Sequence, residues 1–117
     1  MEKSFEFAEN VIGFMVHEEI DREKMKDILS EIEERIKVVT PVCIYIEDET
    51  DEGISMGGFL KAVEFHFSHS NDLDKLAVVS NSKMLKNAME LKDLVVPANV
   101  KSFEKGERMQ AMNWLME

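Results

Sequence analysis

The five residues Val42-Cys43-Ile44-Tyr45-Ile46 decide the fold. They form a short, continuous apolar run rich in residues that favour strands, and the pair Thr40-Pro41 separates this run from a helical pattern before it. A strand that is apolar at every position is typical of the interior of a parallel sheet, where both faces are covered. The sequence therefore predicts a central strand over residues 42–46.

The segment before this strand has the periodicity of a helix. Its apolar stripe, with steps of three, one, three and four residues, consists of Met25, Ile28, Leu29, Ile32 and Ile36. Asp21 is a residue type that caps helix N-termini, so we expect a helix from there to about Lys37. Nearer the N-terminus, the alternation around Phe5 and Phe7 predicts one strand, and the apolar run Val11–Val16 predicts a second that is buried on both faces.

Apolar strands and helices continue to alternate after the central strand. The expected elements are an acidic, solvated loop at 47–53, a helix from about Met56 to Phe67, a strand at Leu76–Val79, a helix capped by Ser82, a strand around Val100–Phe103 and a helix at Glu107–Met116. The order ββαβαβαβα predicts a single α/β domain over residues 1–117, with four helices and a five-stranded mixed, mostly parallel sheet. We expect the strands from Val42 and Leu76 to be central and those from Phe5 and Val100 to lie at the edges.

Charge and composition exclude several classes of function. The chain has 117 residues and a formal net charge of −10, which argues against a nucleic-acid partner because phosphate backbones are bound by clustered Lys and Arg. Its apolar runs are far shorter than the roughly 20 residues that cross a bilayer. The single Cys43 allows no internal disulfide and no multi-cysteine metal site, so we expect a cytoplasmic protein.

Four segments, taken in their order and spacing, resemble the SpoIIAA-like branch of the STAS superfamily. They are residues 10–14 (Asn-Val-Ile-Gly-Phe), 52–59 (Glu-Gly-Ile-Ser-Met-Gly-Gly-Phe), 75–80 (Lys-Leu-Ala-Val-Val-Ser) and 111–115 (Ala-Met-Asn-Trp-Leu). The resemblance implies a compact α/β domain without catalysis, similar in shape to anti-sigma-factor antagonists and, more distantly, to CRAL-TRIO lipid carriers. It also implies binding of small or lipid-like ligands and contact with the periphery of a membrane.

The second and third predicted helices supply the candidate ligand site, an apolar cleft between them. Phe59, Val63 and Phe67 share one helical face, whereas Phe65 is turned about 200° from Val63 and is expected on the outer side. Large apolar groups on both sides indicate a helix that either meets a ligand or is packed between two layers. Met89 likewise falls off the inward stripe of its helix. The residues expected to bind a small apolar or lipid-like ligand are Phe59, Val63, Phe65, Phe67, Met84, Leu85, Lys86 and Met89, with Lys83 and Lys92 also near an anionic head group.

The alternative function is a protein-interaction module of the anti-sigma-antagonist type. Its phosphorylation site would be Ser55, at the start of the second helix, although an ordinary helix cap also accounts for a serine there. His66 and His69 are expected to face solvent or line a ligand site rather than hold a metal. No catalytic group, metal site or cofactor is predicted, and we expect a homodimer formed by the strands around Phe5 and Phe14.

Overall fold

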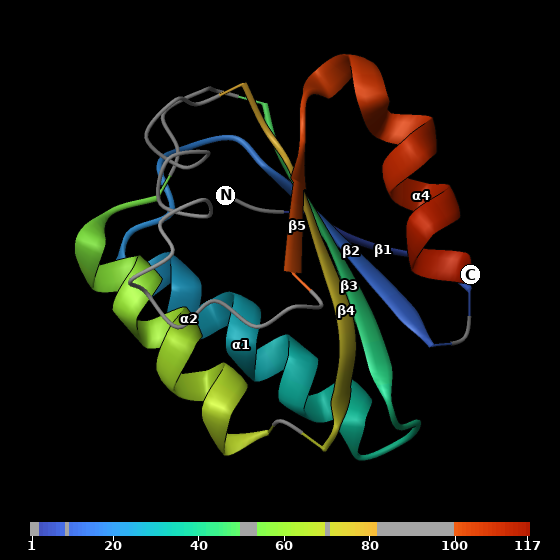
Figure 1. Cartoon of the computed structure of the whole chain (residues 1–117). Helices are drawn as coiled ribbons and strands as arrows, with labels where there is room; N and C mark the ends of the chain where they lie inside the picture. Colours follow the sequence, from blue (N-terminus) through green and yellow to red (C-terminus); the bar gives the residue numbers. More distant parts are fainter. Residues whose placement is uncertain (1–2, 9, 50–53, 70, 82–99) are drawn as a thin grey trace.

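The structure is a computed structural model that describes residues 3–8, 10–49, 54–69, 71–81 and 100–117. Its β-sheet separates two layers of helices, with α1 (Arg22–Ile36) and α2 (Met56–Ser68) on one face and α4 (Arg108–Met116) on the other (Figure 1). A short 3₁₀ helix, Lys105–Glu107, leads into α4. None of the helices in these ranges is long and apolar enough to cross a membrane.

The sheet has the strand order β1-β2-β3-β4-β5. These strands are β1 (Lys3–Ala8), β2 (Val11–Val16), β3 (Val42–Asp48), β4 (Leu73–Val79) and β5 (Val100–Phe103). β1 pairs antiparallel with β2, and the four strands from β2 to β5 run parallel to one another. The prediction that the strands from Val42 and Leu76 are interior and those from Phe5 and Val100 lie at the edges is confirmed.

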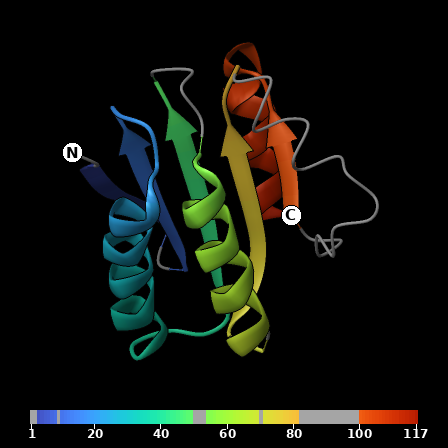
Figure 2. The ribbon, with the colours of Figure 1, turned by 90° about the vertical axis from the view of Figure 1, so that its left-hand side faces the viewer.

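Helix α1 begins where the sequence predicts. The carboxylate of Asp21 accepts a hydrogen bond of 2.8 Å from the backbone N–H of Lys24, which satisfies one of the free donors of the first turn. Four residues of the predicted apolar stripe, from Met25 to Ile32, are buried. They pack beside α2 and against the sheet, so that α1 and α2 lie next to each other over one face (Figure 2).

Helix α2 comes very close to the backbone that links β2 and α1. Its N-cap is Ser55, whose hydroxyl oxygen accepts a hydrogen bond of 3.1 Å from the N–H of Gly58. A side chain could not be added at Gly58, because its Cβ would lie 2.5 Å from the carbonyl oxygen of Ile20. Glycine is therefore required here by a close backbone approach.

The rotation of α2 about its axis differs from the predicted one. Phe65 is only 8% exposed and belongs to the core, whereas Leu60 and Phe67 are 57% and 54% exposed. Phe65 follows Gly58 by seven residues, which places both on one helical face. Because Gly58 must face the Ile20 backbone, Phe65 must face inward, and the predicted inward position of Phe67 is wrong.

The predicted count of five strands and four helices is confirmed only in part. The described residues contain three α-helices, and the predicted helix that starts at Ser82 lies outside them. The acidic segment 47–53 is not wholly a loop either, because Glu47 and Asp48 end β3 and are buried. Phe14 is also fully buried in the core of its own chain, so its side chain is unavailable for a dimer contact. Self-association stays a prediction.

Candidate ligand pocket between α2 and the sheet

An apolar pocket of about 100 Å³ lies between the two helices α1 and α2 and the sheet. Residues from α1, α2, β3, β4 and β5 line it, and most are branched aliphatic side chains such as Ile28, Ile44, Leu76 and Val78. Side chains alternate along each strand, so only every second strand residue reaches the pocket. Ile44 and Ile46 of β3 face the helix pair, while Cys43 and Tyr45 face α4 and belong to a separate core cluster.

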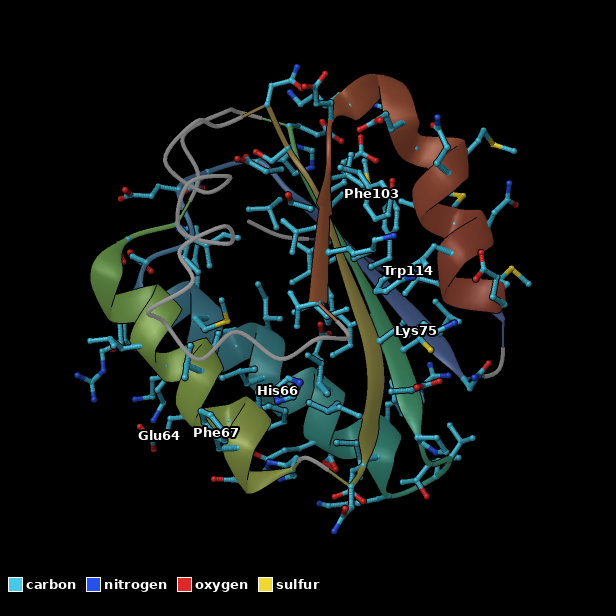
Figure 3. The ribbon with its side chains drawn as sticks, viewed as in Figure 1. Glu64, His66, Phe67, Lys75, Phe103 and Trp114 are labelled. Atoms are coloured by element: carbon cyan, nitrogen blue, oxygen red, sulfur yellow. The ribbon has the colours of Figure 1, made fainter. Side chains whose placement is uncertain are left out.

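His66 is the only polar side chain among the described residues that line this pocket. It lies one position after the buried Phe65, so its direction from the helix axis differs by about 100°. Figure 3 shows it on the sheet side of α2, whereas Glu64 and Phe67 point away from the sheet. Burial lowers the pKa of His66 below its ordinary value of 6.5, and a hydrogen bond with its own backbone partly opposes this shift. The imidazole is thus neutral near pH 7.

A neutral imidazole gives the pocket a specific chemical capacity. One ring nitrogen carries a hydrogen and donates, and the other accepts, so the group can hydrogen-bond to a ligand without adding a charge. The remaining walls offer only dispersion contacts and the release of water from apolar surfaces. Such a site can hold a small apolar molecule and orient one polar atom of it.

A second groove of about 300 Å³ runs along the outer side of α1 and α2. Its walls include Lys26 and Glu33 from α1 and Lys61 and Glu64 from α2, so that each helix contributes one positive and one negative charge. Opposite charges in equal number give no field that would select a charged ligand. The apolar pocket is therefore the stronger candidate site.

The predicted cleft between the second and third helices lies partly outside the described residues. Two of its predicted residues, Val63 and Phe65, line the apolar pocket, and Phe65 also stacks on His69 with 4.1 Å between the ring centroids. Phe67 is exposed and does not line it. The side chain of Phe59 lies outside the described residues, as do Met84, Leu85, Lys86 and Met89 of the predicted third helix.

The sequence reasoning missed the walls that the strands and α1 provide. The sequence predicts only a strand interior for these wall residues, which are Ile44, Ile46, Leu76 and Val78. An apolar run does not reveal whether a neighbouring layer packs against it fully. The pocket role of His66 was one of two alternatives for that residue. Its place one residue beyond Phe65 could have decided between them if the inward face of α2 had been known.

Polar side chains are also buried at the end of β3, where they connect elements of the fold to one another. The hydroxyl of Tyr45 donates a hydrogen bond of 2.6 Å to Glu47, whose other carboxylate oxygen lies 2.6 Å from a guanidinium nitrogen of Arg108 at the start of α4. On the opposite face, Ser80 donates a hydrogen bond of 3.0 Å to Asp48. Within the described ranges, no three His, Cys, Asp or Glu residues are arranged to bind a metal ion.

The position of Ser55 agrees with the simpler interpretation of that residue. Its hydroxyl is half-buried and caps α2, and its own backbone N–H donates a hydrogen bond of 3.0 Å to the carbonyl of Ile20. The acidic residues 50–53 just before it lie outside the described residues. Nothing in this geometry bears on phosphorylation.

Comparison with known proteins supports the fold and gives a family. A search of curated proteins gives no match. Among solved structures, an uncharacterized protein with a SpoIIAA-like fold from Shewanella loihica PV-4 is similar, with a TM-score of 0.65 and 15% sequence identity. The match covers 98% of this chain and 92% of that one. A model of the SpoIIAA-like family matches residues 11–116, and the chain therefore belongs to the SpoIIAA-like family.

Proposed function

We propose that this chain is a binding module that holds a small apolar molecule in the pocket between α2 and the sheet. The observation that carries the proposal is the pocket itself, an apolar space of about 100 Å³ with one polar side chain among its described walls. Well-packed protein interiors contain few voids larger than a water molecule, so a space of this size calls for an explanation. Membership of the SpoIIAA-like family supports a binding or interaction module.

The size of the pocket favours a compact ligand. An engineered apolar cavity of about 150 Å³ in another protein stays free of water and binds benzene. A pocket of about 100 Å³ that opens to the surface can accept a ring or a short chain. A long lipid tail would extend beyond it, so a lipid-like ligand and contact with a membrane remain the less supported form of the proposal.

The proposal is tested by titrating the protein with benzene and following the methyl groups of isoleucine by NMR. We expect the signals of Ile28 and Ile44, which line the pocket, to shift on titration. Val63→Phe places a ring at the half-buried wall of the pocket and should abolish these shifts. Val38→Phe makes the same change at a residue that is 81% exposed and outside the pocket, and should leave them intact.

Two results would contradict the proposal. One is a wild-type protein whose methyl signals do not respond to benzene, and the other is binding that survives Val63→Phe. Native mass spectrometry of the protein from its own host adds an independent measurement. A co-purified apolar molecule supports the pocket, whereas a phosphate on Ser55 would favour the interaction module of the anti-sigma-antagonist type. Co-sedimentation with liposomes tests the membrane contact separately.

A further inference from the structure

His66 brings a single hydrogen-bonding group to an otherwise apolar wall. The side chains that line the pocket with it include Ala62, Val63, Leu76 and Val100, none of which can form a hydrogen bond. The half-buried imidazole already has a hydrogen bond with its own backbone. An apolar ligand that covers the other ring nitrogen would remove it from water and leave it unpaired, which is costly, whereas a polar atom on the ligand avoids this cost. The ligand is therefore expected to carry a polar atom, and the position of His66 fixes where that atom lies.

We infer that the preferred ligand of this pocket is a small, uncharged, apolar molecule with one hydroxyl group, which hydrogen-bonds to the imidazole of His66. The inference rests on the proposed function, since it concerns the occupant of the same pocket. A hydroxyl both donates and accepts, so it suits His66 whichever ring nitrogen carries the hydrogen. A carbonyl, which only accepts, would suit the donor nitrogen alone.

The charges of the protein favour a neutral ligand over an anionic one. No lysine or arginine occurs among the described residues that line the pocket. A carboxylate placed there would lose its hydration and gain no opposite charge from these walls, and an unpaired charge in apolar surroundings is strongly disfavoured. The net charge of −10 over the whole chain adds a long-range repulsion to any anion. A hydroxyl compound meets neither obstacle.

Three probes that share one aromatic ring separate these possibilities, namely benzene, phenol and benzoate. Phenol adds one hydroxyl to benzene, and benzoate adds a carboxylate group, which is larger and carries a negative charge. We expect phenol to bind wild-type protein about fivefold more tightly than benzene, which is the effect of one ordinary hydrogen bond. Benzoate should bind at least about tenfold more weakly than phenol, because its charge is not compensated in the pocket.

Variants assign the preference to His66. His66→Leu replaces the imidazole by an apolar group and should reduce the phenol-to-benzene affinity ratio to about one while benzene still binds. His66→Gln keeps a donor and an acceptor and should restore part of the ratio. His17→Leu is the matched control, because His17 lies outside the pocket at the end of β2 and pairs with Glu49 at 3.3 Å. It should bind all three probes as the wild type does.

The experiment separates the two proposals from each other. If benzene and phenol both fail to bind, the proposed function fails and this inference fails with it. If benzene binds but phenol gains nothing, or if the gain survives His66→Leu, only this inference fails. Tighter binding of benzoate than of phenol would also overturn it and would indicate a cation at the pocket. The ring ¹⁵N shifts of His66 in wild-type protein, which should respond more strongly to phenol than to benzene, provide a test that needs no variant.

Discussion

Replacing Gly58 by alanine should destabilise the protein, whereas the same change at Gly57 should not. At residue 58 the added methyl carbon would lie 2.5 Å from the carbonyl oxygen of Ile20, 3.1 Å from that of Asp21 and 3.2 Å from a side-chain carbon of Ile54. At residue 57 its nearest neighbour is a side-chain carbon of Arg22 at 3.5 Å, an ordinary contact. The two adjacent glycines thus form a matched pair.

The size of the effect follows from what would have to move. Forcing extra carbon into packed surroundings costs about 1–3 kcal/mol in free energy of unfolding. The Ile20 carbonyl cannot retreat freely, because it accepts the backbone hydrogen bond from Ser55, worth about 1 kcal/mol. Alanine regains up to about 1 kcal/mol through its higher helix propensity. We therefore expect Gly58→Ala to lose about 2 kcal/mol and Gly57→Ala to gain up to about 1 kcal/mol.

Urea unfolding measures both variants, and the fluorescence of Trp114, the only tryptophan of the chain, reports the transition. The reasoning would be refuted if the two variants were equally stable, since α2 would then not lie against the Ile20 backbone. Because α2 carries Val63 and His66 to the pocket, Gly58→Ala should also weaken benzene binding. A variant that is destabilised but binds benzene normally would show that the helix shifts without changing the pocket.

Two further predictions concern the core residue Phe65 of α2 and the buried side chain of Tyr45. Phe65→Ala should lower the free energy of unfolding, measured in urea, by about 3–5 kcal/mol. Phe67→Ala, at an exposed position, should change it by no more than about 0.5 kcal/mol, and equal effects would contradict the observed rotation of α2. Burial, and then the hydrogen bond to Glu47, raises the pKa of Tyr45 above its ordinary value of 10. Since Tyr45 is the only tyrosine, absorbance at about 295 nm should show no ionisation in native protein near pH 10 but a transition there in urea. As the pH rises, Tyr45 therefore loses its proton first in the unfolded state. The stability that its neutral side chain contributes is complete below pH 10 and is lost as the pH rises above that value. Ionisation of Tyr45 near pH 10 in native protein would contradict the buried position of its side chain.

Local periodicity was enough to predict most elements of this fold. The stripe from Met25 to Ile36 matches the 3.6-residue period of a helix. The run at Val42–Ile46 is instead recognised by its short length, its continuous apolar character and its strand-favouring residues. The interior and edge positions also followed from sequence, because the runs at Val42–Ile46 and Leu76–Val79 are continuously apolar, the strands from Phe5 and Val100 are more polar, and interior strands are buried on both faces.

Tertiary contacts decided what the periodicity left open. Helix α2 is apolar around more than half of its circumference, so its sequence does not state which face is inward, and the contact between Gly58 and the Ile20 backbone settles it. Glu47 and Asp48 lie in an acidic run that predicts a solvated loop, yet pairing with Arg108, Tyr45 and Ser80 compensates their burial as the end of β3.

The pocket could be predicted only in part for a similar reason. The sequence predicts Val63 and Phe65 as residues of a cleft with the third helix, and both line this pocket, but its opposite walls come from residues that are distant in sequence, such as Ile28, Ile44 and Val78. A helical or strand period reports which side chains of one element point the same way. Whether two such faces meet without a gap depends on the distance and rotation between the elements, and these are set by contacts such as the one at Gly58, which exist only in the folded chain.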